Sequence, residues 1–167
     1  MNNFTMLLAA MTAYFTLSAG QMAEAHDGIH VEDAYARVSG ENAKSAAIFM
    51  TLVNHSTEDD RLLSVTSVVA DRAELHTHTL NANGVMSMGE VTEGFPIAGL
   101  EAHMLDRGGD HIMLLGLKQP LKQGDTVSLT LKFERGEDLI VDIPVDNARK
   151  PDAGAHDMGN MEMPAAD

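Results

Sequence analysis

Histidine and methionine recur in two short segments, ELHTHTLNANGVMSMGEV at residues 74–91 and DHIMLLGL at residues 110–117. The residues concerned are His76, His78, Met86, Met88, His111 and Met113. Imidazole nitrogen and thioether sulfur are neutral, soft donors that suit Cu(I) better than zinc, magnesium or calcium. The chain has no cysteine, which excludes thiolate zinc sites and blue-copper centres. These side chains are therefore candidate Cu(I) ligands.

The middle of the first segment predicts a β-hairpin. Asn81, Asn83 and Gly84 suit a type I turn with a left-handed glycine, which gives a three-residue loop that pairs Asn81 with Val85. Counting outward from this loop predicts three opposite pairs: Leu80 with Met86, His78 with Met88, and His76 with Glu90. Both histidines and both methionines then project from one face, whereas a two-residue Asn-Gly turn would shift the register and separate them.

His111 and Met113 also lie on one side of their strand, because side chains alternate along β structure. If the two segments are neighbours, two imidazoles and two thioethers converge. Such a neutral set leaves bound Cu(I) with its single charge, and it suits carrying copper more than catalysis. Methionine is also a common filler of apolar cores, so plain strand packing explains the same residues. The spacing alone leaves both interpretations open.

The elements that must position these residues are short β-strands. Apolar runs alternate with turn signals rich in Gly, Asn and Asp over residues 29–145, and no long stretch has helical periodicity. Alternation is clearest at Val127, Leu129, Leu131 and Phe133, which share one face. Eight or nine such strands predict an all-β fold, an antiparallel Greek-key β-sandwich or barrel. The expected strands are IHVEDAYARVS, AAIFMTLVNHS, RLLSVTSVV, RAELHTHTL, GVMSMGEV, LEAHMLD, HIMLLGL, DTVSLTLKFE and DLIVDIPV.

The two ends of the chain differ from this central region. Residues 1–25 hold an apolar stretch too short to span a bilayer comfortably, followed by the small-x-small cleavage pattern AEA. We expect a cleaved export signal, although MNNFT lacks the usual Lys or Arg, and then one domain over residues 26–147 without a membrane span. Residues 148–167 lack apolar alternation and predict a flexible, disordered tail rich in His and Met.

The mature chain is strongly acidic. The whole sequence has 25 Asp and Glu and 11 Lys and Arg, and loss of Glu24 with the signal leaves a net charge of −13. Such a surface repels nucleic acid and anionic lipid and favours cations or basic partners. We therefore expect no nucleic-acid partner.

The chain resembles the periplasmic copper chaperones of the PCu(A)C family, whose pattern is H-(M)-x10-M-x21-H-x-M. Further resemblance lies in DDRLLSVTS, AELH, GVMSM and HIMLLGLKQPLKQGDTVSLTLKFE, and it covers roughly residues 29–145. Thr77 stands at the optional methionine, and 22 residues rather than 21 separate Met88 from His111. A one-residue insertion in this glycine-rich connection accounts for the longer gap. Four residues match the ligand positions: His76, Met88, His111 and Met113.

The resemblance implies a cupredoxin-like fold, a periplasmic location and a carrier rather than an enzyme. It also implies that the four matching residues bind Cu(I). The copper would pass to copper-accepting proteins, such as cytochrome c oxidase subunits or Sco-like assembly factors, for assembly of the oxidase copper centre. We expect the carrier to be a monomer.

Other His and Met residues are secondary candidates. His78 is an alternate ligand or a solvated histidine, and Met86 is a ligand or a rim residue. The tail residues His156, Met158, Met161 and Met163 would gather a second ion, since some family members carry comparable extensions associated with extra copper binding. His26, as the mature N-terminus, would offer its amine and imidazole to Cu(II). At both ends the alternative is a residue that binds no metal.

Three other functions stay open on the sequence alone. Copper storage or tolerance needs the same site chemistry as delivery. A copper oxidase or monooxygenase using His26 has little support, because the chain has no recognisable paired carboxylates, nucleophile motif or phosphate loop. A non-metal β-sandwich interaction module predicts indifference to replacement of His111 and Met113.

Overall fold

The computed structural model describes residues 28–40, 42–80 and 84–150. These residues form ten β-strands and no helix, so none of them belongs to a helix that could cross a membrane. Every pair of these strands is antiparallel, and the two sheets they form bury a common apolar core. The predicted all-β antiparallel sandwich is confirmed.

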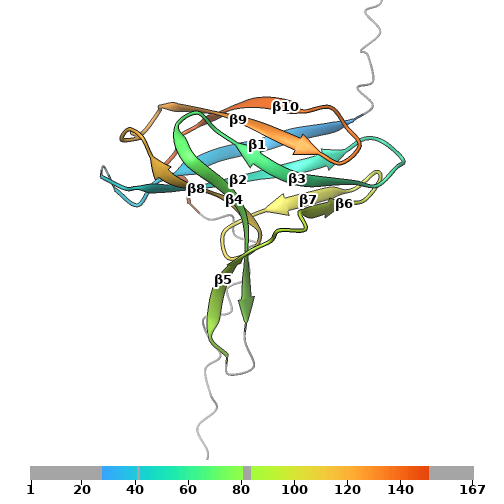
Figure 1. Ribbon diagram of the computed structural model, residues 1–167, viewed down its shortest axis with the longest axis horizontal. Coiled ribbons are helices and arrows are strands. Elements are labelled where there is room, and N and C mark those ends of the chain that lie inside the picture. Colours follow the sequence, from blue (N-terminus) through green and yellow to red (C-terminus); the bar gives the residue numbers. More distant parts are fainter. Residues whose placement is uncertain (1–27, 41, 81–83, 151–167) are drawn as a thin grey trace, which may run out of the picture.

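The larger sheet has six strands (Figure 1). Five follow one another across it, and the sixth, β7 (Ala102–Leu105), pairs with β2 beside β8. The five are, in order, β1 (Ile29–Arg37), β2 (Ser45–Asn54), β8 (His111–Leu117), β4 (Ala70–Leu80) and β5 (Met86–Glu90).

The smaller sheet has four strands and packs against one face of the larger. They are, in order, β10 (Leu139–Pro144), β9 (Thr126–Phe133), β3 (Asp60–Thr66) and β6 (Phe95–Ile97). The alternation predicted in β9 is confirmed, because Val127, Leu129, Leu131 and Phe133 all face the core with at most 5% of their surface exposed. The opposite face of the larger sheet does not contribute to this core.

The sequence patterns predict eight or nine strands, whereas the described residues form ten. The missing strand is β6, which has only three residues and contains Pro96 at its centre. Proline has no N–H to donate, so a strand that contains it belongs at a sheet edge. β6 is such an edge, since it pairs with β3 alone.

The β4–β5 hairpin projects beyond the sandwich (Figure 1). Only the part of β4 from Ala70 to His76 pairs with β8, and the rest of β4 pairs with β5 alone. His111 begins β8 at the level where the hairpin leaves the sheet, because it is paired with His76. The fold thus brings the two His/Met segments to one place.

Several predictions concern residues outside the described parts of the chain. These are the export signal at residues 1–25, the tail methionines and the terminal ligands His26, His156, Met158, Met161 and Met163. The proposed tail boundary at residue 148 falls within the described residues, where the Arg149 guanidinium lies 4.3 Å from the centre of the Tyr35 ring.

Candidate metal centre

The candidate site lies on the outer face of the larger sheet, where β8 and β4 are paired. Ile112 and Leu114 of β8 are fully buried in the core, so the alternate residues His111 and Met113 point to the other face. His111 is directly opposite His76 of β4, and their ring centres are 5.7 Å apart. Although His111 lies on this outer face, only 3% of it is exposed.

The predicted hairpin register is confirmed in the strands. Leu80 is paired with Met86, His78 with Met88, and His76 with Glu90. The sheet therefore has both histidines and both methionines of the hairpin on one face. From this face the Met88 sulfur reaches 3.1 Å from Nε2 of His111. The connecting turn at residues 81–83 lies outside the described residues.

The contacts of His111 determine which of its nitrogens carries a proton. Its Nδ1 lies 3.1 Å from the Gly109 carbonyl oxygen, which can only accept a hydrogen bond. Burial lowers the pKa of His111 below the ordinary 6.5, a larger effect than the opposing hydrogen bond to Gly109, so the neutral ring is favoured at pH 7. A neutral imidazole has one N–H, and here Nδ1 donates it. Nε2 therefore presents a bare lone pair to the sulfur of Met88.

A tight glycine loop supplies the carbonyl that fixes this tautomer. Gly108 has φ +92°, in the region that favours glycine. A Cβ on Gly109 would lie 2.5 Å from Oδ1 of Asp106, so a side chain there would push the Asp106 carboxylate aside. The Gly109 carbonyl also lies 3.2 Å from Nδ1 of His78, whose ring stacks on His111 at 5.0 Å between centres.

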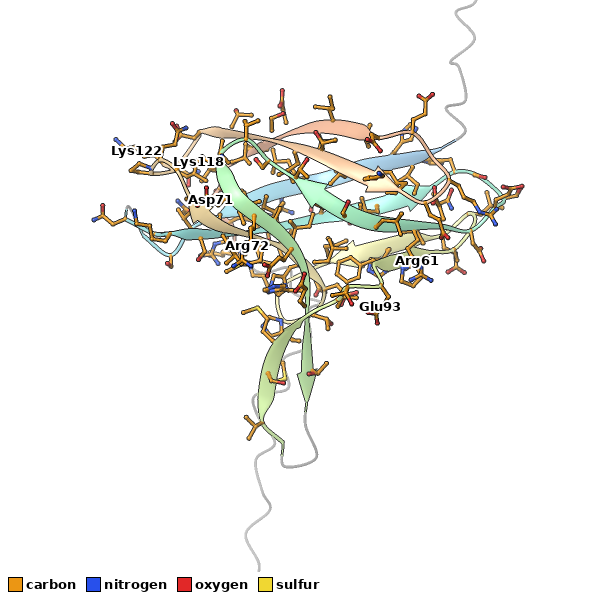
Figure 2. All side chains as sticks on the ribbon, in the orientation of Figure 1. Arg61, Asp71, Arg72, Glu93, Lys118 and Lys122 are labelled. Carbon is orange, nitrogen blue, oxygen red and sulfur yellow. The ribbon has the colours of Figure 1, made fainter. Side chains whose placement is uncertain are left out.

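His76 is held by the carboxylate of Glu74, which the His/Met pattern does not include. Its Nε2 donates to Oε2 of Glu74 at 2.9 Å, and Oε1 of Glu74 lies 2.8 Å from Nη1 of Arg72. Figure 2 labels Arg72 near the level where the hairpin leaves the sandwich. With Nε2 donating, Nδ1 of neutral His76 carries the lone pair, and this atom is buried without a hydrogen-bond partner. A buried lone pair without a donor is available to a cation.

The two remaining methionines lie farther from this contact. Met113 is half-buried on the same face as His111, between Ala47 of β2 and Glu74 of β4. Met86 lies two residues beyond Met88 on β5 and is 54% exposed. The fold thus brings His76, Met88 and His111 together, with Met113 on the adjacent row and Met86 on the outer part of the hairpin.

The donors fit a soft cation. Among residues 28–40, 42–80 and 84–150, no three His, Asp or Glu side chains form a group that could hold a metal, so sulfur is needed to complete a site. Two donors at about 2.0 and 2.3 Å from a tetrahedral ion lie about 3.5 Å apart. The observed 3.1 Å between Nε2 and Sδ is within a few tenths of that separation. An ion therefore needs only a small opening of this contact.

Some contacts around the site were not predicted from the sequence. The ring of Phe49 lies 6.1 Å from that of His111, and the Arg107 guanidinium lies over Phe49. Glu74 could have been found, because it precedes His76 by two residues and so shares its face. The role of the Gly109 carbonyl depends on the path of a loop, which no residue type reveals.

His103 and His55 make other contacts than those of the candidate site. His103 lies 3.0 Å from the Asp110 carboxylate and stacks on Phe95, and Met104 beside it is 63% exposed. His55 follows β2 and packs edge-to-face on His30 at 4.8 Å.

Comparison with known proteins places this fold in a family. The family model described as "Putative lipoprotein LpqE-like" matches residues 29–145, which is most of the chain. The chain belongs to the LpqE-like family. A relative of this LpqE-like chain, "Putative lipoprotein Lxx21020" of Leifsonia xyli subsp. xyli, is 34% identical over 139 residues, covering 83% of this chain and 81% of the relative.

Two solved structures resemble this LpqE-like protein. The Cu(I) form of DR1885 from Deinococcus radiodurans is 33% identical, has a TM-score of 0.57, and is matched over 78% of this chain and 87% of its own. The copper-bound PCuAC domain of PmoF2 is 22% identical, with a TM-score of 0.58 over 71% of this chain and 92% of that domain, and it shows the fold alone. These matches confirm the predicted cupredoxin-like fold class.

Proposed function

We propose that this protein is a copper carrier that binds one Cu(I) ion through His76, Met88, His111 and Met113. The contact between Nε2 of His111 and Sδ of Met88 carries this proposal. Both atoms present lone pairs and no proton lies between them, so a cation relieves their repulsion. Sulfur and neutral imidazole favour Cu(I) among biological metals. The Cu(I) form of the 33% identical Deinococcus radiodurans protein supports the choice of metal.

Carriage rather than catalysis is supported by the same donors. Four neutral ligands fill a tetrahedral ion and leave no position for a substrate. Met88 is 49% exposed while His111 is buried, so one ligand can be exchanged at the surface while another holds the ion. We propose that a monomer delivers Cu(I) in the periplasm to acceptors such as cytochrome c oxidase subunits or Sco-like assembly factors. The lipoprotein description of the family fits an exported protein.

Accessory copper sites at the chain ends belong to the same proposal. His156, Met158, Met161 and Met163 would take a second ion, and His26 would bind Cu(II) if cleavage follows Ala25. A protein that ends at residue 147 tests the tail, and blocking the amine of His26 tests the N-terminus. Loss of a second, weaker binding step in either variant supports the accessory site that it removes.

The proposal is tested by anaerobic Cu(I) titration of residues 26–167 against bathocuproine disulfonate. The variants are His76→Ala, Met88→Leu, His111→Ala and Met113→Leu, with the matched controls His55→Ala and Met104→Leu. We expect tight one-to-one binding that weakens at least about 100-fold in each of the four variants and stays unchanged in the controls. Weak binding by the unsubstituted protein, or equal affinity in all six variants, contradicts the proposal.

A further inference from the structure

His78 contacts the proposed copper site, although it belongs to the part of β4 that projects from the sandwich. Its ring stacks on His111 with 28° between the ring planes. It is also directly opposite Met88 in the hairpin. His78 therefore faces the same two residues, His111 and Met88, that form the closest contact of the proposed site.

The protonation pattern of His78 matches that of His111. The Gly109 carbonyl has two lone pairs and lies within 3.2 Å of Nδ1 in both rings. In its neutral form His78 therefore donates from Nδ1 and keeps a lone pair on Nε2. The two stacked rings thus direct the same nitrogen, Nδ1, at one carbonyl oxygen, which leaves Nε2 of each ring for other contacts.

A second sulfur lies next to this nitrogen donor. Met86 is two residues from Met88 on the same face of β5, which makes it the diagonal neighbour of His78. Diagonal neighbours have Cα atoms about 7–8 Å apart, which a methionine side chain can span. Both methionines are about half exposed, whereas the His76 side chain is 13% exposed and His111 is 3% exposed.

Burial separates the two histidines of the proposed site from an acceptor. A partner cannot touch His76 or His111 directly, because little of either side chain reaches the surface. An ion held by these residues needs a route by which it stays bound while it becomes accessible. His78 and Met86 lie on the side of the His111–Met88 contact that faces the projecting part of the β4–β5 hairpin.

We propose that His78 and Met86 complete an outer Cu(I) site that shares His111 and Met88 with the inner site, and that copper leaves the protein through it. This inference rests on the proposed function. Copper moves by ligand exchange: its bonds to His76 and Met113 break as bonds to Nε2 of His78 and Sδ of Met86 form. The ion stays Cu(I), so no electron moves. The neutral His78 ring, with Nδ1 at the Gly109 carbonyl, offers Nε2 to the ion.

The test separates the affinity for copper from its rate of release. The Cu(I)-loaded protein is mixed anaerobically with excess bathocuproine disulfonate in a stopped-flow instrument, and equilibrium competition gives the affinity of the same samples. The variants are His78→Phe, which keeps a flat ring for stacking, and Met86→Leu. Their matched controls are His55→Phe and Met104→Leu. Circular dichroism checks that each variant is folded.

We expect His78→Phe and Met86→Leu to slow release at least about tenfold while affinity stays within about threefold. Both controls should release copper at the original rate. Unchanged release in both hairpin variants overturns the outer site and leaves the carrier proposal intact. A loss of affinity in His78→Phe as large as that in His111→Ala also overturns it, because His78 is then an equilibrium ligand. Absence of tight binding in the unsubstituted protein overturns both proposals.

Discussion

Two polar side chains are buried in the described part of the chain, and they differ in how their polar atoms are satisfied. Asn54 donates to the carbonyls of Glu58 and Ile97 at 2.8 and 3.3 Å, and its oxygen accepts from the Ser56 amide at 2.9 Å. His111 donates to one carbonyl, while its second nitrogen faces a sulfur. A buried group with complete partners stabilises a loop, whereas one that faces another lone pair is completed by a cation.

The histidine pairs near these two residues sharpen the contrast. His30 and His55 meet edge-to-face at 76°, much as His76 and His111 meet at 79°. His30 lines an open cavity of about 690 Å³, together with acidic side chains such as Glu58 and Asp60. His111 is instead enclosed and contacts Met88. Imidazole geometry is therefore similar in both places, and burial with a sulfur donor distinguishes the proposed copper site.

Removal of the sulfur donors should abolish this difference between the two histidine pairs. Its effect on Cu(I) affinity is the largest that we expect. In the double variant Met88→Leu/Met113→Leu the site keeps two imidazoles and loses both soft donors. We expect Cu(I) affinity to fall more than about 1000-fold, as measured by chelator competition, with little change in fold. The double variant His30→Ala/His55→Ala is the control and should keep full affinity. Equal losses of Cu(I) affinity in the two double variants would show that the His30–His55 pair is needed for binding as much as the two sulfur donors are.

Leucine at the two buried polar positions should separate stability from binding. Asn54→Leu leaves three backbone groups without their partner, which should lower the free energy of unfolding by about 2–3 kcal/mol in urea titration. His111→Leu removes one hydrogen bond and fills the space with an apolar side chain, so it should cost less than about 1 kcal/mol. Copper affinity should show the reverse order, lost in His111→Leu and kept in Asn54→Leu. Equal destabilisation by the two substitutions would mean that His111 is a structural residue.

The carboxylate beside His76 offers a smaller and more specific change. Loss of a carboxylate that orients a histidine ligand typically reduces metal affinity about 10–100-fold. We expect that loss in Glu74→Ala and most of the affinity restored in Glu74→Gln, because the amide oxygen still accepts from Nε2 of His76. Arg72→Ala should have the weakest effect, since 70% of the Arg72 side chain is exposed. A Gln variant as weak as the Ala variant would assign the effect to charge instead of orientation.

Much of the fold follows from local patterns. The alternation of Val127, Leu129 and Leu131 correctly assigns the core face of β9, and the Asn-rich turn correctly predicts the hairpin register. Both depend on the period of two in a strand, which the sequence displays directly. The strand around Pro96 does not show in the sequence, because its three residues are too few for alternation and its central residue is proline.

The proposed site is only partly accessible to sequence reasoning. The spacing around His76, Met88 and His111 indicates the donors, and the register predicts their common face. The tautomer of His111 cannot be predicted, because it depends on where the loop carries the Gly109 carbonyl. Burial of His111 likewise comes from neighbours on three strands, Phe49 of β2, His76 of β4 and Met88 of β5. Residue types thus identify donor atoms, while tertiary contacts decide which donors lack a proton.

The burial of His111 should make the free energy of unfolding of the copper-free protein depend on pH. This is the smallest effect that we expect. Burial holds the pKa of folded His111 below the 6.5 of the unfolded chain, so below about pH 6.5 the unfolded chain binds the extra proton. The free energy of unfolding should therefore fall as pH drops through 6.5, by at most about 1.4 kcal/mol per pH unit from this residue. Urea titrations between pH 5 and 7.5 measure it against His111→Leu, which cancels the other titrating groups. Parallel curves for the two proteins would show that His111 titrates alike in both states, and Cu(I) would then compete with a proton at Nε2.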